Sequence, residues 1–105
     1  MYGTVARMRV RPGMAEAAHA FMRQSESRPV PGAVAVYLYR MDTDPNEIYM
    51  AAVFESKESY RANADSPEQD AEYRQLLSFL DGPPEWHDGE ILFAQLSQDA
   101  GPGES

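Results

Sequence analysis

The chain has 105 residues, a formal net charge of −8 and no cysteine. This length suits a single domain with a modest core, and the charge argues against nucleic acid or an anionic membrane surface as a partner. The lack of cysteine excludes disulfides and thiol catalysis and fits a cytoplasmic protein. No run of about 18 apolar residues occurs, so no membrane span is predicted, and the first strand begins too early to leave room for a signal peptide.

The first third of the chain predicts a strand followed by a helix. Residues 3–11 alternate between two kinds of side chain, which is typical of a strand with two different faces. Pro12 and Gly13 end this pattern. Apolar side chains then return at helical spacing from about residue 14 to residue 24, and the proline-rich segment 28–32 cannot continue a helix.

The middle of the chain predicts two strands and two helices. Residues 33–41 are rich in β-branched and aromatic side chains, and a turn at 42–46 leads into a strand at 48–54 that is apolar on both faces. Ser56 and Ser66 each stand where an N-cap residue would begin a helix, and Ser66 is followed by proline at the first helical position.

The end of the chain predicts one long helix and a last strand. The helix that begins after Ser66 carries an apolar stripe up to Leu80 and ends at Gly82. Residues 90–96 are expected to form the last strand. Residues 99–105 then form a short flexible tail, which leaves 1–98 as one domain.

The order strand, helix, strand, strand, helix, strand predicts an α+β fold, the ferredoxin-like arrangement with a four-stranded antiparallel sheet. Helices can cover only one face of such a sheet. The other face would expose apolar side chains in a monomer, so a homodimer through the sheet faces is predicted. The side chains expected on that face are Val5, Val34, Val36, Leu38 and Val53.

The segment from Phe54 to Pro67 carries a family resemblance. An aromatic residue ends a strand, Glu55-Ser56 and a helix follow, and Ser66-Pro67 begins twelve residues after the aromatic. This arrangement resembles the antibiotic biosynthesis monooxygenase family, and the similarity covers roughly residues 3–96. It implies a dimeric α/β barrel of ferredoxin-like subunits. The family holds cofactor-free oxygenases, heme-degrading enzymes and members of unknown role.

The resemblance implies a ligand pocket between the helices and the sheet. Its expected lining, the substrate-binding and catalytic candidates together, is Ala6, Met8, Met50, Phe54, Tyr60, Asn63, Tyr73 and Leu77. Simple core packing explains Met8, Met50 and Leu77 at least as well. Asn63 and Tyr73 are the candidate catalytic residues, because relatives carry pocket-facing polar residues there and both side chains could stabilise a phenolate. No general base is assigned.

The heme-degrading branch uses an asparagine, a tryptophan and a histidine that are replaced here by Ala6, Phe54 and Tyr73. We therefore expect no heme and no other cofactor. The resemblance then implies a cofactor-independent monooxygenase that acts on a small aromatic or polyketide-like phenol or hydroquinone. The alternative is a non-catalytic dimeric barrel that binds a small apolar metabolite, which a wholly apolar pocket would favour.

The two histidines have simpler interpretations than catalysis. Glu16 and His19 show the Glu-x-x-His spacing of di-iron bundles, but the second copy and the further glutamates of such a site are missing, so no metal site is predicted. His19 is expected at the boundary of its helix. His87 and Asp88 are adjacent in a strand, which directs their side chains to opposite faces.

Arg7, Arg9 and Arg11 are expected to form a basic stripe on one face of the first strand. Arginine forks match carboxylates and phenolates, so the stripe could capture an anionic ligand. We favour ion pairing at the dimer, with Glu55 on a neighbouring strand as the partner, because a buried arginine is rarely left unpaired.

Overall fold

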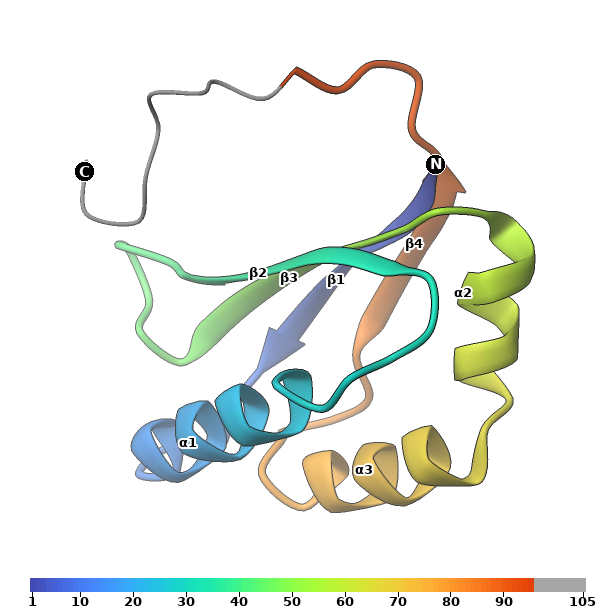
Figure 1. Cartoon of the computed structure of the whole chain (residues 1–105). Coiled ribbons are helices and arrows are strands. Elements are labelled where there is room, and N and C mark those ends of the chain that lie inside the picture. The colour runs from blue at the N-terminus through green and yellow to red at the C-terminus, as the bar shows by residue number, and fades with distance from the viewer. Residues whose placement is uncertain (96–105) are drawn as a thin grey trace.

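A computed structural model describes residues 1–95, apart from the side chain of Glu26. Within these residues the chain forms four strands and three helices. Their bounds are β1 (Tyr2–Arg9), α1 (Ala15–Glu26), β2 (Ala33–Arg40), β3 (Glu47–Phe54), α2 (Lys57–Ala64), α3 (Pro67–Leu77) and β4 (Glu85–Glu90). The strands make one antiparallel sheet in the order β2-β3-β1-β4, and the helices lie on one side of it (Figure 1). This confirms the predicted α+β ferredoxin-like fold.

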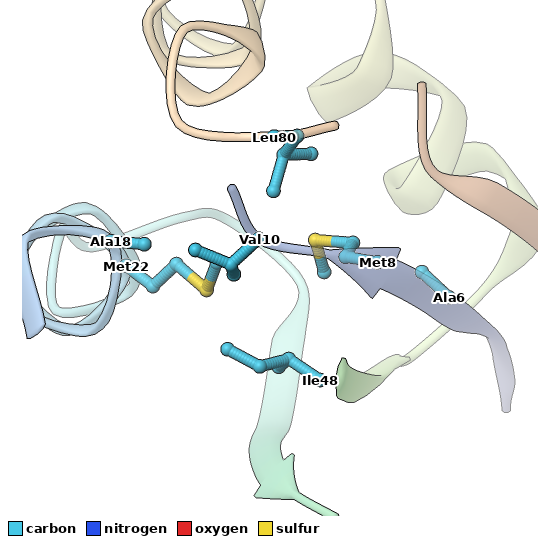
Figure 2. Packing of buried hydrophobic residues seen from close by; sticks show 7 residues of the cluster. All are labelled: Ala6, Met8, Val10, Ala18, Met22, Ile48 and Leu80. Carbon is cyan, nitrogen blue, oxygen red and sulfur yellow. The ribbon is translucent and has the colours of Figure 1, made fainter. Parts of the chain in front are cut away.

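The hydrophobic core lies between α1 and the end of the sheet at which β1 stops. Ala6, Met8 and Val10 alternate along β1 toward the helices and are at most 2% exposed. Figure 2 shows them in one cluster with side chains from α1, β3 and the segment after α3, namely Ala6, Met8, Val10, Ala18, Met22, Ile48 and Leu80. Burial of a large apolar side chain contributes about 1.5–3 kcal/mol. The core therefore anchors α1 and leaves the opposite end of the sheet to α2, which contacts β1 and β3.

Both serine N-caps are confirmed. The Ser56 hydroxyl accepts a hydrogen bond from Ser59 N at 3.1 Å, and the Ser59 hydroxyl in turn accepts one from Ser56 N at 3.2 Å, which completes a capping box. Ser66 Oγ accepts a bond from Gln69 N at 3.1 Å, with Pro67 as the first helical residue. Each cap contributes about 1 kcal/mol. None of the helices in the described residues is long and apolar enough to cross a membrane.

The position of the last strand differs from the prediction. The strand β4 covers Glu85–Glu90 rather than residues 90–96, and residues 91–95 lie outside any strand. The pairing with β1 runs from Arg7 opposite Glu85 to Tyr2 opposite Glu90, so β1 has no residues left to pair with the apolar run that follows. Leu96 and the predicted tail at 99–105 lie outside the described residues.

The faces of β2 also differ from the prediction. Val36 lies opposite Ala52 and Leu38 opposite Met50, so both belong to the face that the helices cover. A register shift between Ala33 and Ala35 causes this, because one extra residue turns every following side chain to the other face. The outer face instead carries Tyr37 and Tyr39, which are 53% and 51% exposed, beside Val5 at 48%.

The basic stripe on the outer face is paired within the chain, although not with Glu55. Arg7 bonds to Glu47 at 2.9 Å and lies 3.7 Å from Glu85, and Arg9 lies 2.9 Å from Asp44. Glu47 is the residue opposite Arg9 in the β1–β3 pair. Arg11 has left the strand, and its Nε donates to the Leu80 carbonyl at 2.9 Å. The ion-pairing interpretation thus holds for Arg7 and Arg9 with different carboxylates.

Candidate functional site

A cavity of about 520 Å³ lies at the end of the covered sheet face that the core does not fill. Small residues at the centre of the sheet, Thr4 and Ala52, leave this space open beneath α2 and α3. Ligand pockets commonly range over about 300–1,000 Å³. Its lining comes from every element, namely Thr4, Ser25, Arg28, Val30, Ala33, Val34, Ala35, Val36, Met50, Ala52, Phe54, Tyr60, Asn63, Ala64, Gln69, Asp70, Glu72, Tyr73, Trp86 and Asp88.

One wall of the cavity holds a polar group made by three elements. Asp88 on β4 lies directly opposite Thr4 on β1, so both side chains share the covered face. Tyr60 reaches over from α2, and its hydroxyl donates a hydrogen bond of 2.8 Å to Asp88 Oδ1. Thr4 is only 4% exposed, and its Oγ1 lies near the Tyr60 hydroxyl but makes no close hydrogen bond among residues 1–95.

The Tyr60 hydroxyl is held in its protonated form. Burial raises the pKa of Tyr60 to about 12, and the hydrogen bond to Asp88 is the second cause, because ionisation would place two negative charges side by side. A hydrogen-bonding interaction with the Thr4 hydroxyl acts in the other direction and lowers the pKa of Tyr60. The ring packs edge-on against Phe54 at a centroid distance of 5.4 Å and lies 5.3 Å from the ring of Tyr2. Tyr60 is therefore a fixed donor to Asp88 at neutral pH.

The lining next to this group is aromatic and carries two further polar groups. Tyr73 on α3 and Trp86 on β4 lie 6.3 Å apart between ring centroids. Asn63 Nδ2 makes only a long contact of 3.4 Å with Gln69 Oε1, and the Tyr73 hydroxyl makes no hydrogen bond within the described part of the chain. Both groups are thus available to a ligand.

The charges around the cavity differ in how they are compensated. Glu72 receives bonds of 2.6 Å from both Arg28 Nε and Ser25 Oγ, which ties the segment after α1 to α3. Asp70 pairs with Arg74 at 2.9 Å. Asp88 differs, because its partner among the described residues is the neutral Tyr60 hydroxyl.

The comparisons with known proteins place the chain in a family. The model of the family described as antibiotic biosynthesis monooxygenase matches residues 1–75. The chain belongs to the antibiotic biosynthesis monooxygenase family. A search of the curated proteins finds no match.

Several solved structures have a similar fold. An antibiotic biosynthesis monooxygenase from Chloroflexus aurantiacus is 23% identical with a TM-score of 0.77, over 90% of this chain and 95% of that one. A variant of SnoaB, a cofactor-independent oxygenase from Streptomyces nogalater, is 17% identical with a TM-score of 0.79, over 89% and 94%. A protein of unknown function from Nitrosomonas europaea is 20% identical with a TM-score of 0.78, over 95% of each chain. At these identities the likeness concerns the fold alone.

The structure brings five of the eight predicted lining residues to the cavity, namely Met50, Phe54, Tyr60, Asn63 and Tyr73. It does not bring the other three there. Ala6 and Met8 face the helices at the α1 end of β1, where the core encloses them, and Leu77 is half-buried at the end of α3, outside the lining. The family position alone could not separate the core end of this sheet face from the cavity end.

Sequence reasoning missed Thr4, Trp86 and Asp88. Thr4 alternates with Val5 along the first strand, but nothing in the sequence marked it as a pocket residue. Trp86 and Asp88 stand two residues apart, the spacing of one strand face. That signal was hidden because the last strand was expected further along the chain, where the side chains are more apolar.

Neither histidine reaches the cavity. His19 on α1 is half-buried, and its Nε2 has no hydrogen-bond partner in the part of the chain that is described. Burial, and then Arg40 and Arg23, lower the pKa of His19. His87 lies on the outer face of β4 with Nε2 at 2.9 Å from Glu85 Oε1. Within residues 1–95 no group of three or more histidine, cysteine, aspartate or glutamate side chains could hold a metal ion.

Proposed function

We propose that this protein is a cofactor-independent monooxygenase that oxidises a small electron-rich phenol or hydroquinone of the aromatic polyketide kind. One observation carries the proposal. The cavity is lined by apolar and aromatic side chains together with polar ones, and two of its lining residues, Asn63 and Tyr73, make no strong internal hydrogen bond through Nδ2 and Oη. Donors of this kind can stabilise a developing phenolate.

The reaction needs no other reductant, because the substrate supplies all four electrons that O2 takes up. The phenol loses its hydroxyl proton, and an electron passes from the ring to O2. The two radicals join through a new bond between oxygen and a ring carbon. The O–O bond then breaks, the ring carbon becomes a carbonyl, and one water leaves, so a phenol and O2 give a quinone and water. Asn63 and Tyr73 stabilise the oxygen anion while the aromatic walls orient the ring.

The polar groups of the cavity favour this enzymatic proposal over the non-catalytic one. A barrel that only stores an apolar metabolite needs no hydrogen bonds inside its pocket. Here Tyr60 and Asp88 are joined by a bond of 2.8 Å within the lining. Tight binding of a ligand with no turnover in a broad panel of phenols would give the non-catalytic function the lead.

The experiment measures O2 uptake with hydroquinones and polycyclic phenols. Removal of a hydrogen bond to the developing phenolate by Tyr73→Phe or Asn63→Ala should lower kcat by about 10²-fold with little loss of stability. The matched controls are His19→Ala and His87→Ala. Both histidines lie outside the cavity, so each variant should lower kcat by well under tenfold. If the histidine variants are the inactive ones, the assignment of the site is wrong.

We also propose that the active unit is a homodimer formed through the outer faces of the sheets. That face exposes Val5, Tyr37 and Tyr39 by about half each, and the ion pairs of Arg7 and Arg9 satisfy its charges. A stable interface buries roughly 800 Å² from each partner.

Sedimentation equilibrium tests this assembly. Micromolar protein should sediment at twice the 11.7 kDa of the chain, and Tyr37→Glu should shift it toward the monomer because a charge enters the interface. Gln75→Glu, on the exposed side of α3, is the matched control and should leave the dimer intact. Native protein that sediments only as a monomer would rule the dimer out.

A further inference from the structure

We propose that Asp88 is the group that accepts the phenolic proton of the substrate, with Tyr60 and Thr4 holding it and the substrate in place. This inference rests on the proposed function and supplies the base that the sequence did not reveal. The first observation is the position of Asp88 in the sheet. Asp88 and Thr4 are cross-strand partners on the covered face, with Cα atoms about 5 Å apart in such a pair. Sites on paired strands are held more precisely than sites on loops.

The second step concerns unused hydrogen-bonding capacity. Tyr60 occupies Asp88 Oδ1 at 2.8 Å, and Asp88 Oδ2 has no partner in the described chain. Thr4 Oγ1 is buried in the cavity lining; it lies near enough to the Tyr60 hydroxyl to lower the pKa of Tyr60, but it makes no close hydrogen bond with any of residues 1–95. A buried hydroxyl is nearly always satisfied, and when the protein does not satisfy it a ligand or water is expected to do so.

The two free groups match the two functions of a phenolic hydroxyl. The Asp88 carboxylate accepts the proton of the ligand, and the Thr4 hydroxyl donates to the ligand oxygen. A bond from a hydroxyl to a carboxylate is among the stronger kinds in proteins. Glu72 and Asp70 also border the cavity, but both are paired with arginine. Asp88 is therefore the carboxylate of the lining that remains free to act as a base.

The proton follows a balanced path. As an electron leaves the ring for O2, the phenolic O–H bond breaks and the proton passes to Asp88 Oδ2. A carboxylate is basic enough for this step, because a phenol that loses an electron becomes far more acidic. Asp88 returns this proton to the terminal oxygen of the ring-bound peroxide. It then takes the proton of the ring carbon as the O–O bond breaks, and that proton joins the departing hydroxide as water.

The first test measures turnover against the acidity of the substrate. General bases contribute about 10²–10⁴-fold. Asp88→Asn should therefore lose about that factor with weakly acidic phenols and little with phenols that are already ionised at the assay pH. An equal loss across the series would mean that Asp88 only shapes the site, and this would overturn the proposal. Glu90→Gln is the matched control, because it removes a carboxylate from the same face of the same strand, outside the cavity.

The second test needs no turnover, so it separates this inference from the proposed function. Trp86 is the only tryptophan of the chain and lines the cavity, so its fluorescence reports ligand binding. The native protein should bind a phenol at least tenfold more tightly than its methyl ether, and Asp88→Asn should abolish this preference. Thr4→Val should weaken phenol and ether alike, because either oxygen can accept from Thr4.

The positioning role of Tyr60 has its own readout. Tyr60→Phe should lower kcat by about tenfold while KM changes little and the response to substrate acidity is kept. If the phenol preference survives Asp88→Asn, the inference fails whether or not a turned-over substrate is found. If no phenol in the panel turns over but the preference is lost, the monooxygenase proposal fails and Asp88 stands only as the group that accepts a hydrogen bond from a bound phenol.

Discussion

Replacement of Tyr60 by phenylalanine tests how the cavity wall is held together. The half-buried ring packs against two aromatic rings and its hydroxyl donates to Asp88; burial and this hydrogen bond, in that order, raise the pKa of Tyr60 from 10.0 to about 12. One unit of pKa difference between folded and unfolded chain corresponds to about 1.4 kcal/mol. The stabilisation is fully present below pH 10 and is lost as the pH rises through the folded pKa of about 12.

The magnitude at an accessible pH follows from these two pKa values. At about pH 11 the unfolded chain has released the Tyr60 proton and the folded chain has not, so about 1.4 kcal/mol is lost relative to about pH 9. Asp88 is exposed, and screening by solvent reduces this to about 1 kcal/mol. Tyr60→Phe cannot ionise, so its stability should fall by that much less over the same interval.

The assay is urea unfolding at the two pH values, at fixed protein concentration so that association does not enter the comparison. Asp88→Asn should lie between the native protein and Tyr60→Phe, because it removes the bond to the carboxylate and keeps the burial. Asp88→Asn should also lower the Tyr60 pKa when the ring carbon is followed by NMR. If the native protein, Asp88→Asn and Tyr60→Phe all lose the same stability between the two pH values, Tyr60 is not the source of the alkaline loss.

Three further predictions concern other parts of the fold. The pKa of His19 is lowered in the folded chain, so the free energy of unfolding is highest above the unfolded pKa of 6.5 and falls as the pH drops below it. His19→Phe should remove this loss of stability between about pH 7 and about pH 5. A variant that loses as much stability as the native protein over this interval would contradict the prediction. Gly32 has φ of 81°, and an added Cβ would meet Ser59, so Gly32→Ala should cost about 2–4 kcal/mol by thermal unfolding. Gly13 has φ of 84° with open space around it, so Gly13→Ala should lower the free energy of unfolding by only about 1–2 kcal/mol. If Gly32→Ala and Gly13→Ala lose the same stability, the Ser59 side chain moves aside without cost. Thr4→Val should raise the stability of the ligand-free protein by about 1 kcal/mol in the same assay, because it removes a buried hydroxyl that makes no close hydrogen bond. Destabilisation would show that the interaction of Thr4 with the Tyr60 hydroxyl is a full hydrogen bond.

Part of the candidate site could be read from the sequence. Asn63 and Tyr73 were expected at the pocket because the family places polar residues there, and Tyr60 was expected in the pocket lining between the helices and the sheet. Asp88 could not be assigned in the same way. Its role depends on β1, which puts Thr4 beside it, and on α2, which brings Tyr60 above it; these partners are 84 and 28 residues away along the chain.

The sequence by itself determined the features that depend on near neighbours. The alternation along β1 and the caps at Ser56 and Ser66 act over a few residues, so they can be read without the fold. Only the tertiary structure decided which side of β2 faces the helices, because the register shift near Ala33 depends on pairing with β3. It likewise decided that β4 is the polar segment from Glu85, since backbone pairing with β1 outweighs the greater hydrophobicity of the residues that follow. The cavity follows from both, because its polar wall forms only when β1, β4 and α2 meet.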